Sequence, residues 1–295
     1  MQISTTLFYD MASKRMTTLT GRANVLQTQI ATGKRVQSAS EDAALAQQVA
    51  EFDRKDSDSA VYQTNLALAG SLLGQADGVL TNMNGQLQRA KELALQSANG
   101  TQTPESRKLI AVEMSSIVDS LVGLANTRNL RGQPLFGTEG GTKAVTDNGD
   151  GTFAFAPTKV SDVPIGDGQM VKATESADRI FNFGGSTDTL TMLSALAKTL
   201  GDGDAPSAGA LDDLTKAADQ VTFVQASVGA RGARIELQQS QLTTASVDRA
   251  ALRSSVEDVD ITSSIAELQK IMTVLSATQA SFSKLSSLSL FNYLR

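Results

Sequence analysis

Cysteine, histidine and tryptophan are all absent from this 295-residue sequence, and the first two absences exclude much of enzyme chemistry. Without imidazole or thiol groups there can be no Ser-His-Asp triad, cysteine nucleophile, disulfide or zinc site of His and Cys ligands. Phosphoryl transfer and hydrolysis by paired carboxylates stay formally open, but no two acidic residues stand out as a catalytic pair. The sequence therefore predicts a protein that is not an enzyme, with no catalytic, cofactor-binding or metal-binding residues.

Excess positive charge and long apolar runs are also missing. The net charge is −5, which gives no electrostatic reason to expect nucleic acid as a partner. The longest apolar runs cover only a few residues, so we expect no membrane insertion. The N-terminus has neither the basic start nor the apolar core of a cleaved signal peptide. We therefore expect the protein either to stay inside the cell or to be exported without such a peptide.

Heptad spacing of apolar residues toward both ends is the strongest pattern that the sequence contains. Apolar residues spaced alternately by three and four form a narrow stripe on one side of a helix, which is buried against another helix. The seven-residue repeats include Leu66, Leu73, Leu80, Leu87, Leu214, Val221, Val228, Ile235, Leu242, Ile261, Leu268, Leu275 and Phe282. This pattern is typical of an assembly subunit and not of an enzyme with a substrate pocket.

The N-terminal part is expected to form two successive helices. The first covers 4–32, and the second runs over 41–98 after a break. Ser38 and Glu41 fit a capping box at the start of the second helix, and Ser40 is an alternative N-cap. Four glycines lie inside this helix, and we interpret them as marks of close packing: Gly70, Gly74, Gly78 and Gly85.

A short turn leads to a third helix, which is expected to form an antiparallel hairpin with the second. Thr103 is the expected N-cap, with Pro104 as the first helical residue. The helix is predicted to end near Arg128. Its inward side is predicted to consist of Leu109, Val112, Ile117, Leu121 and Leu124.

The middle of the chain loses the helical period and becomes richer in glycine and proline. Short strands are expected at 152–156, 169–172 and 179–183. Helical patterns return at 187–200, 209–251 and 259–289. The simplest closure pairs the 209–251 helix with the helical hairpin and the last helix with the first.

The predicted fold class is mainly α: a long helical bundle and coiled coil built from both chain ends, with a small β-containing insert in the middle. Three domains are expected. A terminal coiled-coil domain combines 1–40 with 252–295, and a helical bundle core combines 41–137 with 187–251. The small variable β-containing domain covers 138–186.

Several short segments resemble those of a known family. They are Gln2-Ile-Ser-Thr, Gln29-Ile-Ala-Thr-Gly-Lys-Arg-Val36, Ser40-Glu-Asp-Ala-Ala44, Leu87–Thr101, Pro134-Leu-Phe-Gly137 and Leu288-Ser-Leu-Phe-Asn-Tyr-Leu294. On these segments the chain resembles the bacterial flagellin family over about 1–137 and 209–295. Its C-terminal ending is more similar to the members that join hook to filament than to filament flagellins.

The resemblance implies a structural subunit of the bacterial flagellum. The terminal helices would be disordered in the free monomer and order on assembly. The implied partners are other copies of the chain, the adjoining hook-associated protein and flagellin, and an export chaperone at the C-terminal region. The implied location is extracellular, in the flagellum, after type III export.

Nine apolar residues on the terminal helices are the predicted assembly interface. Marginal amphipathic ends suit folding that is coupled to assembly, since the cost of ordering is offset only when a partner stripe arrives. The predicted residues are Leu7, Leu19, Leu26, Ile30, Ile261, Leu268, Leu275, Phe282 and Leu285.

Two other functions stay open at this stage. Within the family, the chain could be a short filament flagellin that forms long homopolymers. From a different class, it could be an exported adaptor with a coiled-coil interface and no role in the flagellum. An enzyme is a distant third because no constellation supports one.

Three local motifs resemble functional sites, and each also has a plainer structural interpretation. Asp147–Gly151 has some calcium-loop character but lacks ligands, so we interpret it as a turn. Gly33-Lys34 lacks the upstream glycine of a phosphate loop, so Lys34 and Arg35 are expected to be surface charges or intersubunit contacts. Arg89, Leu93 and Glu113 match the flagellin surface that an innate immune receptor recognises, and we expect this face to pack against neighbouring subunits.

Overall fold

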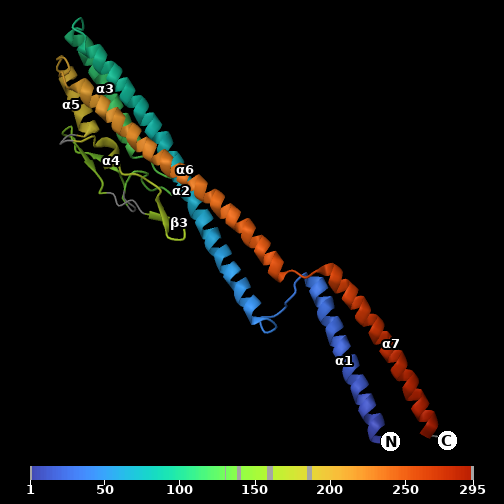
Figure 1. Ribbon diagram of the computed structural model, residues 1–295. Coiled ribbons are helices and arrows are strands. Elements are labelled where there is room, and N and C mark those ends of the chain that lie inside the picture. The colour runs from blue at the N-terminus through green and yellow to red at the C-terminus, as the bar shows by residue number, and fades with distance from the viewer. Residues whose placement is uncertain (1, 130, 138–140, 158–161, 185–187, 294–295) are drawn as a thin grey trace. The chain divides into compact units, whose positions relative to one another are not determined.

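The computed structural model describes the whole chain except residues 1, 130, 138–140, 158–161, 185–187 and 294–295 (Figure 1). The side chains of 2–6, 8 and 285–293 are also outside the description. The helices are α1 Gln2–Thr32, α2 Ala43–Ala98, α3 Pro104–Ala125, α4 Ala177–Phe181, α5 Thr189–Gly201, α6 Ala210–Glu257 and α7 Ile261–Tyr293. The strands are β1 Val145–Asp147, β2 Phe153–Phe155, β3 Asp162–Gly166 and β4 Gln169–Lys172. The predicted fold class, mainly helical with a small β-containing middle, is confirmed.

The chain divides into two compact units. A terminal unit combines 1–57 with 245–295, and a central unit covers 58–244. Helices α2 and α6 therefore contribute to both units. The three-domain division expected from the sequence stays a prediction. None of the helices in the described part of the chain has both the length and the apolarity needed to cross a membrane.

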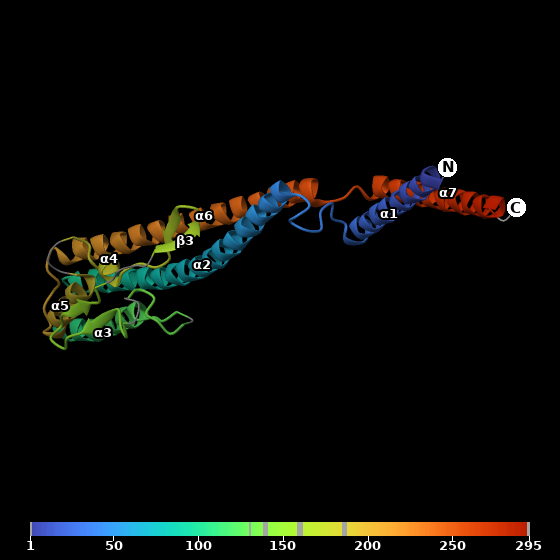
Figure 2. The ribbon, with the colours of Figure 1, turned by 90° about the horizontal axis from the view of Figure 1, so that it is seen from below.

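The central unit is built around the predicted heptads of α2 and α6. Leu66, Leu80 and Leu87 are fully buried, and so are Leu214 and Val221 opposite them. They belong to one apolar cluster that also takes in α3, α5 and the β-containing insert. In both views α6 runs alongside α2, and α3 lies beside the C-terminal half of α2 (Figures 1 and 2).

The start of α3 is as predicted, whereas the start of α2 and the inward side of α3 are not. The amide of Ser106 donates to the Thr103 side chain at 3.2 Å, which confirms the N-cap. Helix α2 starts at Ala43, and Asp42 caps it by accepting from the Leu45 amide at 3.0 Å. On α3 the buried side is Ile110, Ala111, Met114, Ile117, Val118, Leu121 and Ala125, whereas Leu109 and Val112 are exposed.

Two antiparallel hairpins make up the strand content of the described residues. Strand β1 pairs with β2, and β3 pairs with β4 with an irregularity between Pro164 and Gly166. The strand predicted at 179–183 is wrong, since this segment belongs largely to the short helix α4. Ser176 caps α4 by accepting from the Arg179 amide at 3.2 Å, which favours a helical turn over an extended chain.

Helix α6 is longer than predicted and continues through the polar stretch after residue 251, where the sequence predicts its end. Arg253 lies in this stretch and pairs with Glu257 one turn further on and with Asp53 of α2. The ion pairs of Arg253 and the half-buried Val256 support the last turns of the helix, which continues to Glu257.

The interpretation of the α2 glycines as close packing within the chain holds weakly at one position. A Cβ added at Gly70 would lie 3.7 Å from the Ile235 side chain. A Cβ added at Gly74, Gly78 or Gly85 would meet nothing within 4 Å. Contacts inside this chain therefore do not explain why these three residues are glycine.

Candidate assembly surface

Helices α1 and α7 form an antiparallel pair in the terminal unit (Figures 1 and 2). Near the end of the pair, the rings of Tyr9 and Phe282 meet edge to face with their centroids 5.3 Å apart. Further along, the fully buried apolar cluster of the pair consists of Ala23, Leu26 and Ile271. The prediction that the last helix pairs with the first is confirmed.

The seam between the two helices follows a strict alternation of three and four residues. The seam consists of Tyr9, Ala12, Met16, Leu19, Ala23, Leu26 and Ile30 on α1, and Ser264, Leu268, Ile271, Leu275, Thr278 and Phe282 on α7, all buried or half-buried, and Gln29 and Glu267 are half-buried beside it. This is the spacing of a coiled coil. Alanine, serine and threonine occupy several of these positions, so the seam buries little apolar area and is thin for its length.

The structure places six of the nine predicted assembly residues in this seam. Leu26 is buried, and five others are half-buried: Leu19, Ile30, Leu268, Leu275 and Phe282. Leu7 and Ile261 point outward, with 59% and 49% of their surface exposed. The side chain of Leu285 lies outside the described residues. Whether these residues act in assembly stays a prediction.

Other apolar side chains of the pair are exposed and were not predicted. They are Met11, Val25, Ile265, Met272 and Val274. Ile265 and Met272 are seven residues apart, and this repeat could have been found in the sequence. Together with Leu7 and Ile261 they leave both helices with apolar surface on more than the shared seam. A paired helix with further apolar surface is suited to pack against additional helices.

A groove of about 550 Å³ lies along one flank of the pair. It is lined by Leu19, Arg22, Ala266, Glu267, Lys270, Ile271 and Val274. Arg22 and Glu267 form an ion pair across the seam, but both side chains are well exposed, so the pair contributes little to stability. The groove thus combines an apolar floor with charged edges.

A cluster of charged residues ties the base of the terminal unit together. The Lys34 Nζ lies 2.6 Å from Glu257 Oε1, and the Arg253 Nε lies 2.8 Å from Glu257 Oε2. Arg253 also binds Asp53 of α2 at 2.8 Å. Glu257 is largely buried, and hydrogen bonds from Lys34 first and Arg253 second hold its pKa below the usual range of a glutamate. Lys34 is therefore engaged within the chain, which the sequence did not indicate.

The backbone reinforces this charged cluster. The Arg35 amide donates to the Glu257 carbonyl at 2.8 Å, and the Val259 amide donates to the Gly33 carbonyl at 2.9 Å. Gly33 has a φ of 72°, a left-handed conformation that favours glycine where α1 ends. These bonds hold the segment after α1 against the segment between α6 and α7.

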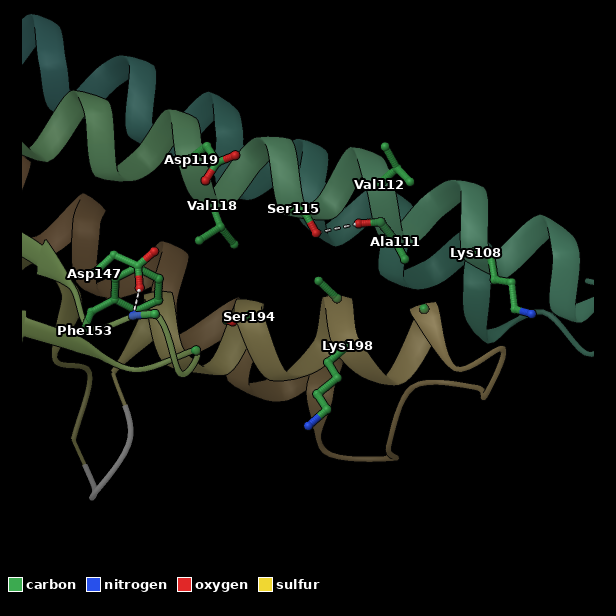
Figure 3. Close-up of a pocket in the computed structure, with 14 residues that line it drawn as sticks. Lys108, Ala111, Val112, Ser115, Val118, Asp119, Asp147, Phe153, Ser194 and Lys198 are labelled. Carbon is green, nitrogen blue, oxygen red and sulfur yellow. Dashed lines mark hydrogen bonds between the residues drawn. The ribbon is translucent and has the colours of Figure 1, made fainter.

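A cleft of about 610 Å³ in the central unit lies between α3, α5 and the β1–β2 turn (Figure 3). Lys108 and Lys198 stand with Asp119 and Asp147 among its lining residues. Asp147 accepts from the Gly149 amide at 2.8 Å, so this carboxylate serves the turn itself. The cleft offers no constellation for catalysis.

The turn over Asp147–Gly151 is an ordinary polar turn, as predicted. Asp150 accepts from the amide and hydroxyl of Thr152, and these bonds lower the pKa of the carboxyl. Within the described residues no three His, Cys, Asp or Glu side chains are grouped to hold a metal ion.

The residues Arg89, Leu93 and Glu113, expected to form a face that packs against neighbouring subunits, are not all exposed. Arg89 binds Glu113 at 2.7 Å and Glu92 at 3.1 Å, and all three are exposed. Leu93 is buried in the apolar core with 1% of its surface exposed, so it is not available to a partner. The expectation is corrected for Leu93, because it lies on the buried side of α2 with Ala90 and Ala94.

Comparison with known proteins places both helical ends in one family. The model of the bacterial flagellin N-terminal helical region matches residues 3–139, and that of the C-terminal helical region matches residues 211–294. The flagellin of Listeria monocytogenes is 28% identical over 274 residues, which cover 88% of this chain and 86% of the relative. Flagellar hook-associated protein 3 of Salmonella typhimurium is 24% identical over 316 aligned positions, which cover 99% of each chain.

Solved structures show the same fold. Flagellar hook associated protein-3 from Legionella pneumophila superposes with a TM-score of 0.66 at 14% identity, covering 70% of this chain and 98% of that chain. FlgL from Bacillus cereus superposes with a TM-score of 0.56 at 21% identity, covering 72% of this chain and 100% of that chain.

The two family matches lie on α1–α3 and α6–α7, the helices that carry the heptads, and leave most of the β-containing insert between them. Proteins of this kind are structural components and not enzymes, which confirms the prediction made from the missing side-chain chemistry. The chain belongs to the bacterial flagellin family.

Proposed function

We propose that this chain is a structural subunit of the bacterial flagellum that joins the hook to the filament. The observation that carries the proposal is the similarity to hook-associated protein 3 along the full length of both chains. The C-terminal segment Leu288–Leu294, which is more similar to junction proteins than to filament flagellins, supports the same choice.

Assembly would use the terminal pair, α1 with α7. The thin seam leaves the pair with little stability of its own, while Leu7, Ile261, Ile265 and Met272 offer apolar surface to further helices. Contacts with other copies, with the adjoining hook-associated protein and with flagellin would then complete the burial. On this proposal, monomers order their ends fully only when they assemble.

Export to the outside of the cell is part of the proposal. A chain without cysteine forms no disulfide that would hinder its passage in an unfolded state. An export chaperone would bind the C-terminal region, where α7 exposes Ile265, Met272 and Val274. The mature subunit would be extracellular, within the flagellum.

A filament flagellin is the second candidate, favoured by the similarity to the Listeria flagellin over most of that protein. The two candidates differ in what the chain builds. A filament subunit forms long homopolymers from purified monomer, whereas a junction subunit stops at monomers or small rings.

A deletion strain distinguishes these functions. Cells lacking the chain would be imaged by electron microscopy, and their culture supernatant would be analysed for flagellin. Hooks without filaments, together with unpolymerised flagellin in the medium, are the result expected for a junction subunit. Hooks without filaments and without other flagellin in the medium would identify the chain as the filament subunit. Normal flagella would overturn a flagellar role and leave an exported adaptor as the function to test.

A further inference from the structure

Helix α6 carries a second heptad-spaced stripe on the side that faces away from the core. This α6 stripe consists of Phe223, Ala226, Ala230, Ala233, Leu237, Ser240 and Thr244. All seven residues are exposed and uncharged, and they span three heptads, about 32 Å of helix. Phe223 and Leu237 are its large members, with 61% and 60% of their surface exposed, and the Arg179 guanidinium of α4 lies 5.9 Å from the centre of the Phe223 ring. An uncharged stripe of this length on a solvent-facing helix is unusual unless another helix covers it.

Helix α2 carries a matching stripe made only of small residues. This α2 stripe consists of Ala60, Thr64, Ala67, Ser71, Gly74, Gly78, Thr81 and Gly85, all exposed and uncharged, again with alternating spacings of four and three. Each helix-interior glycine destabilises the monomer by about 1 kcal/mol relative to alanine. Because the spaces beside Gly74, Gly78 and Gly85 are empty in this chain, packing within the monomer does not offset that cost.

A surface hollow lies beside part of the α2 stripe. This groove of about 420 Å³ lies between α2 and α6 and is lined by Ala67, Ser71 and Gly74 of the stripe, by Gly229 and Gly232 of α6, and by the charged Asp77 and Glu236. The α6 stripe supplies two large side chains, Phe223 and Leu237, and the α2 stripe supplies space to receive them. This is the size relation of knobs and holes between packed helices.

The two stripes also lie at the same level along the helices of the central unit. Helices α2 and α6 are antiparallel, with Gly70 beside Ile235 and Asn84 bonded to Thr222. Residues 61–82 of α2 are therefore level with residues 223–244 of α6. Consider two copies side by side, with their long axes parallel and no shift along them. The α6 stripe of one copy would then run antiparallel to the α2 stripe of the other, over the same length. In this register Phe223 of one copy lies opposite Thr81 and Gly85 of the other.

We propose that the α6 stripe of one copy packs into the α2 stripe of the next copy. The proposal rests on the assembly role proposed above and names the surfaces that neighbouring central units use. Since the two stripes are on different helices, each copy can use both at once. Such a head-to-tail contact, repeated from copy to copy, forms a closed ring when the rotation between neighbouring copies adds up to a full turn.

Disulfide trapping tests this register, and the absence of native cysteine keeps the background clean. Pairs of single-cysteine full-length chains would be co-expressed in the deletion strain, and isolated flagella would be oxidised and analysed without reductant. The matched pairs are Ala230→Cys with Gly74→Cys and Thr244→Cys with Ala60→Cys. The mismatched controls exchange partners: Ala230→Cys with Ala60→Cys, and Thr244→Cys with Gly74→Cys. These misplace the same thiols by about 21 Å.

We expect at least tenfold more covalent dimer from matched than from mismatched pairs, and none from any single variant alone. Equal yields from matched and mismatched pairs would overturn the proposal, and so would dimers from Ala230→Cys alone, which require a symmetric contact. If the pairs fail to cross-link while the variants restore filaments, the stripes are wrong and the junction role stands. If deletion leaves flagella normal, the proposed function itself is wrong.

A charge at the centre of the α6 stripe gives a second test. Leu237→Glu changes an exposed side chain, so the monomer should keep its helix content by circular dichroism. In the deletion strain it should restore at least tenfold fewer filaments than Gln241→Glu, an exposed neighbour outside both stripes and outside the groove. Full restoration by Leu237→Glu would contradict the docking of the α6 stripe.

Discussion

Glu257 at the base of the terminal unit is the most informative single residue to change. Its side chain is only 12% exposed and receives charged hydrogen bonds from Lys34 and Arg253. Replacement by glutamine keeps the shape and removes the charge. Hydrogen bonds to charged groups contribute about 1.5 to 3 kcal/mol. Lys34 is half exposed and can turn to water, so we expect a loss near the lower figure, about 1.5 kcal/mol.

Hydrogen exchange measures this loss where it occurs. The amides of Arg35 and Val259 bond across the same joint, and they exchange when the joint opens. A loss of about 1.5 kcal/mol corresponds to roughly tenfold faster exchange of both amides in Glu257→Gln. Glu51→Gln is the matched control, because Glu51 pairs with Arg54 and Lys55 on an exposed helix face. Its effect on the joint should be below about twofold.

The same joint should weaken in acid. Because the pKa of Glu257 is lowered in the folded protein, the group stabilises the fold above the ordinary glutamate pKa of about 4.3. That contribution disappears as the pH falls through the lowered value. After correction for intrinsic exchange, acidification below about pH 4.3 should speed exchange at Arg35 more in the native chain than in Glu257→Gln. Unchanged exchange in the variant at neutral pH would refute the role assigned to Glu257.

Three further predictions concern other parts of the fold. Leu80→Ala should lower the free energy of unfolding of the central unit by about 2 to 5 kcal/mol, measured in urea, because Leu80 is fully buried. Leu95 is exposed, so Leu95→Ala should change the same free energy by under about 0.5 kcal/mol. Similar losses from the two variants would contradict the assigned core. Leu275→Asp should leave the central unit folded by circular dichroism and block assembly, and a strain with normal filaments would disprove this. Gly74→Ala should stabilise the monomer by about 0.4 to 1 kcal/mol, since a methyl group meets no neighbour, and a lower melting temperature would show that the space is occupied.

Local signals made most helix boundaries predictable. Thr103 and Pro104 form a start that needs no tertiary information, and the heptads of α2 and α6 continue long enough to exclude other periods. The inward side of α3 was harder, because Leu109 and Ile110 are adjacent apolar residues and support two helical phases. The core, which buries Ile110, decides between them. Which side of α3 faces the core is thus decided by the neighbouring helices and not by the sequence of α3 alone.

The charged cluster at the base could not be predicted, for a different reason. Its partners, Lys34 and Asp53 with Arg253 and Glu257, are about 200 residues apart in the chain. Residues so far apart in the chain show no spacing pattern that would identify them as ion pairs. Taken without their partners, the charged residues around Arg253 indicate the end of a helix. In the structure this polar stretch forms the last turns of α6.

The small residues of α2 connect stability with assembly. A helix optimised only as part of a monomer would carry alanine at Gly74, Gly78 and Gly85, because alanine stabilises helices and space for it exists. Retaining glycine costs the monomer about 1 kcal/mol at each position. That cost is offset if the helix of another copy packs closely against the backbone at those positions. The inward heptads of α2 and α6 thus specify the monomer, and the outward stripes specify how copies pack together.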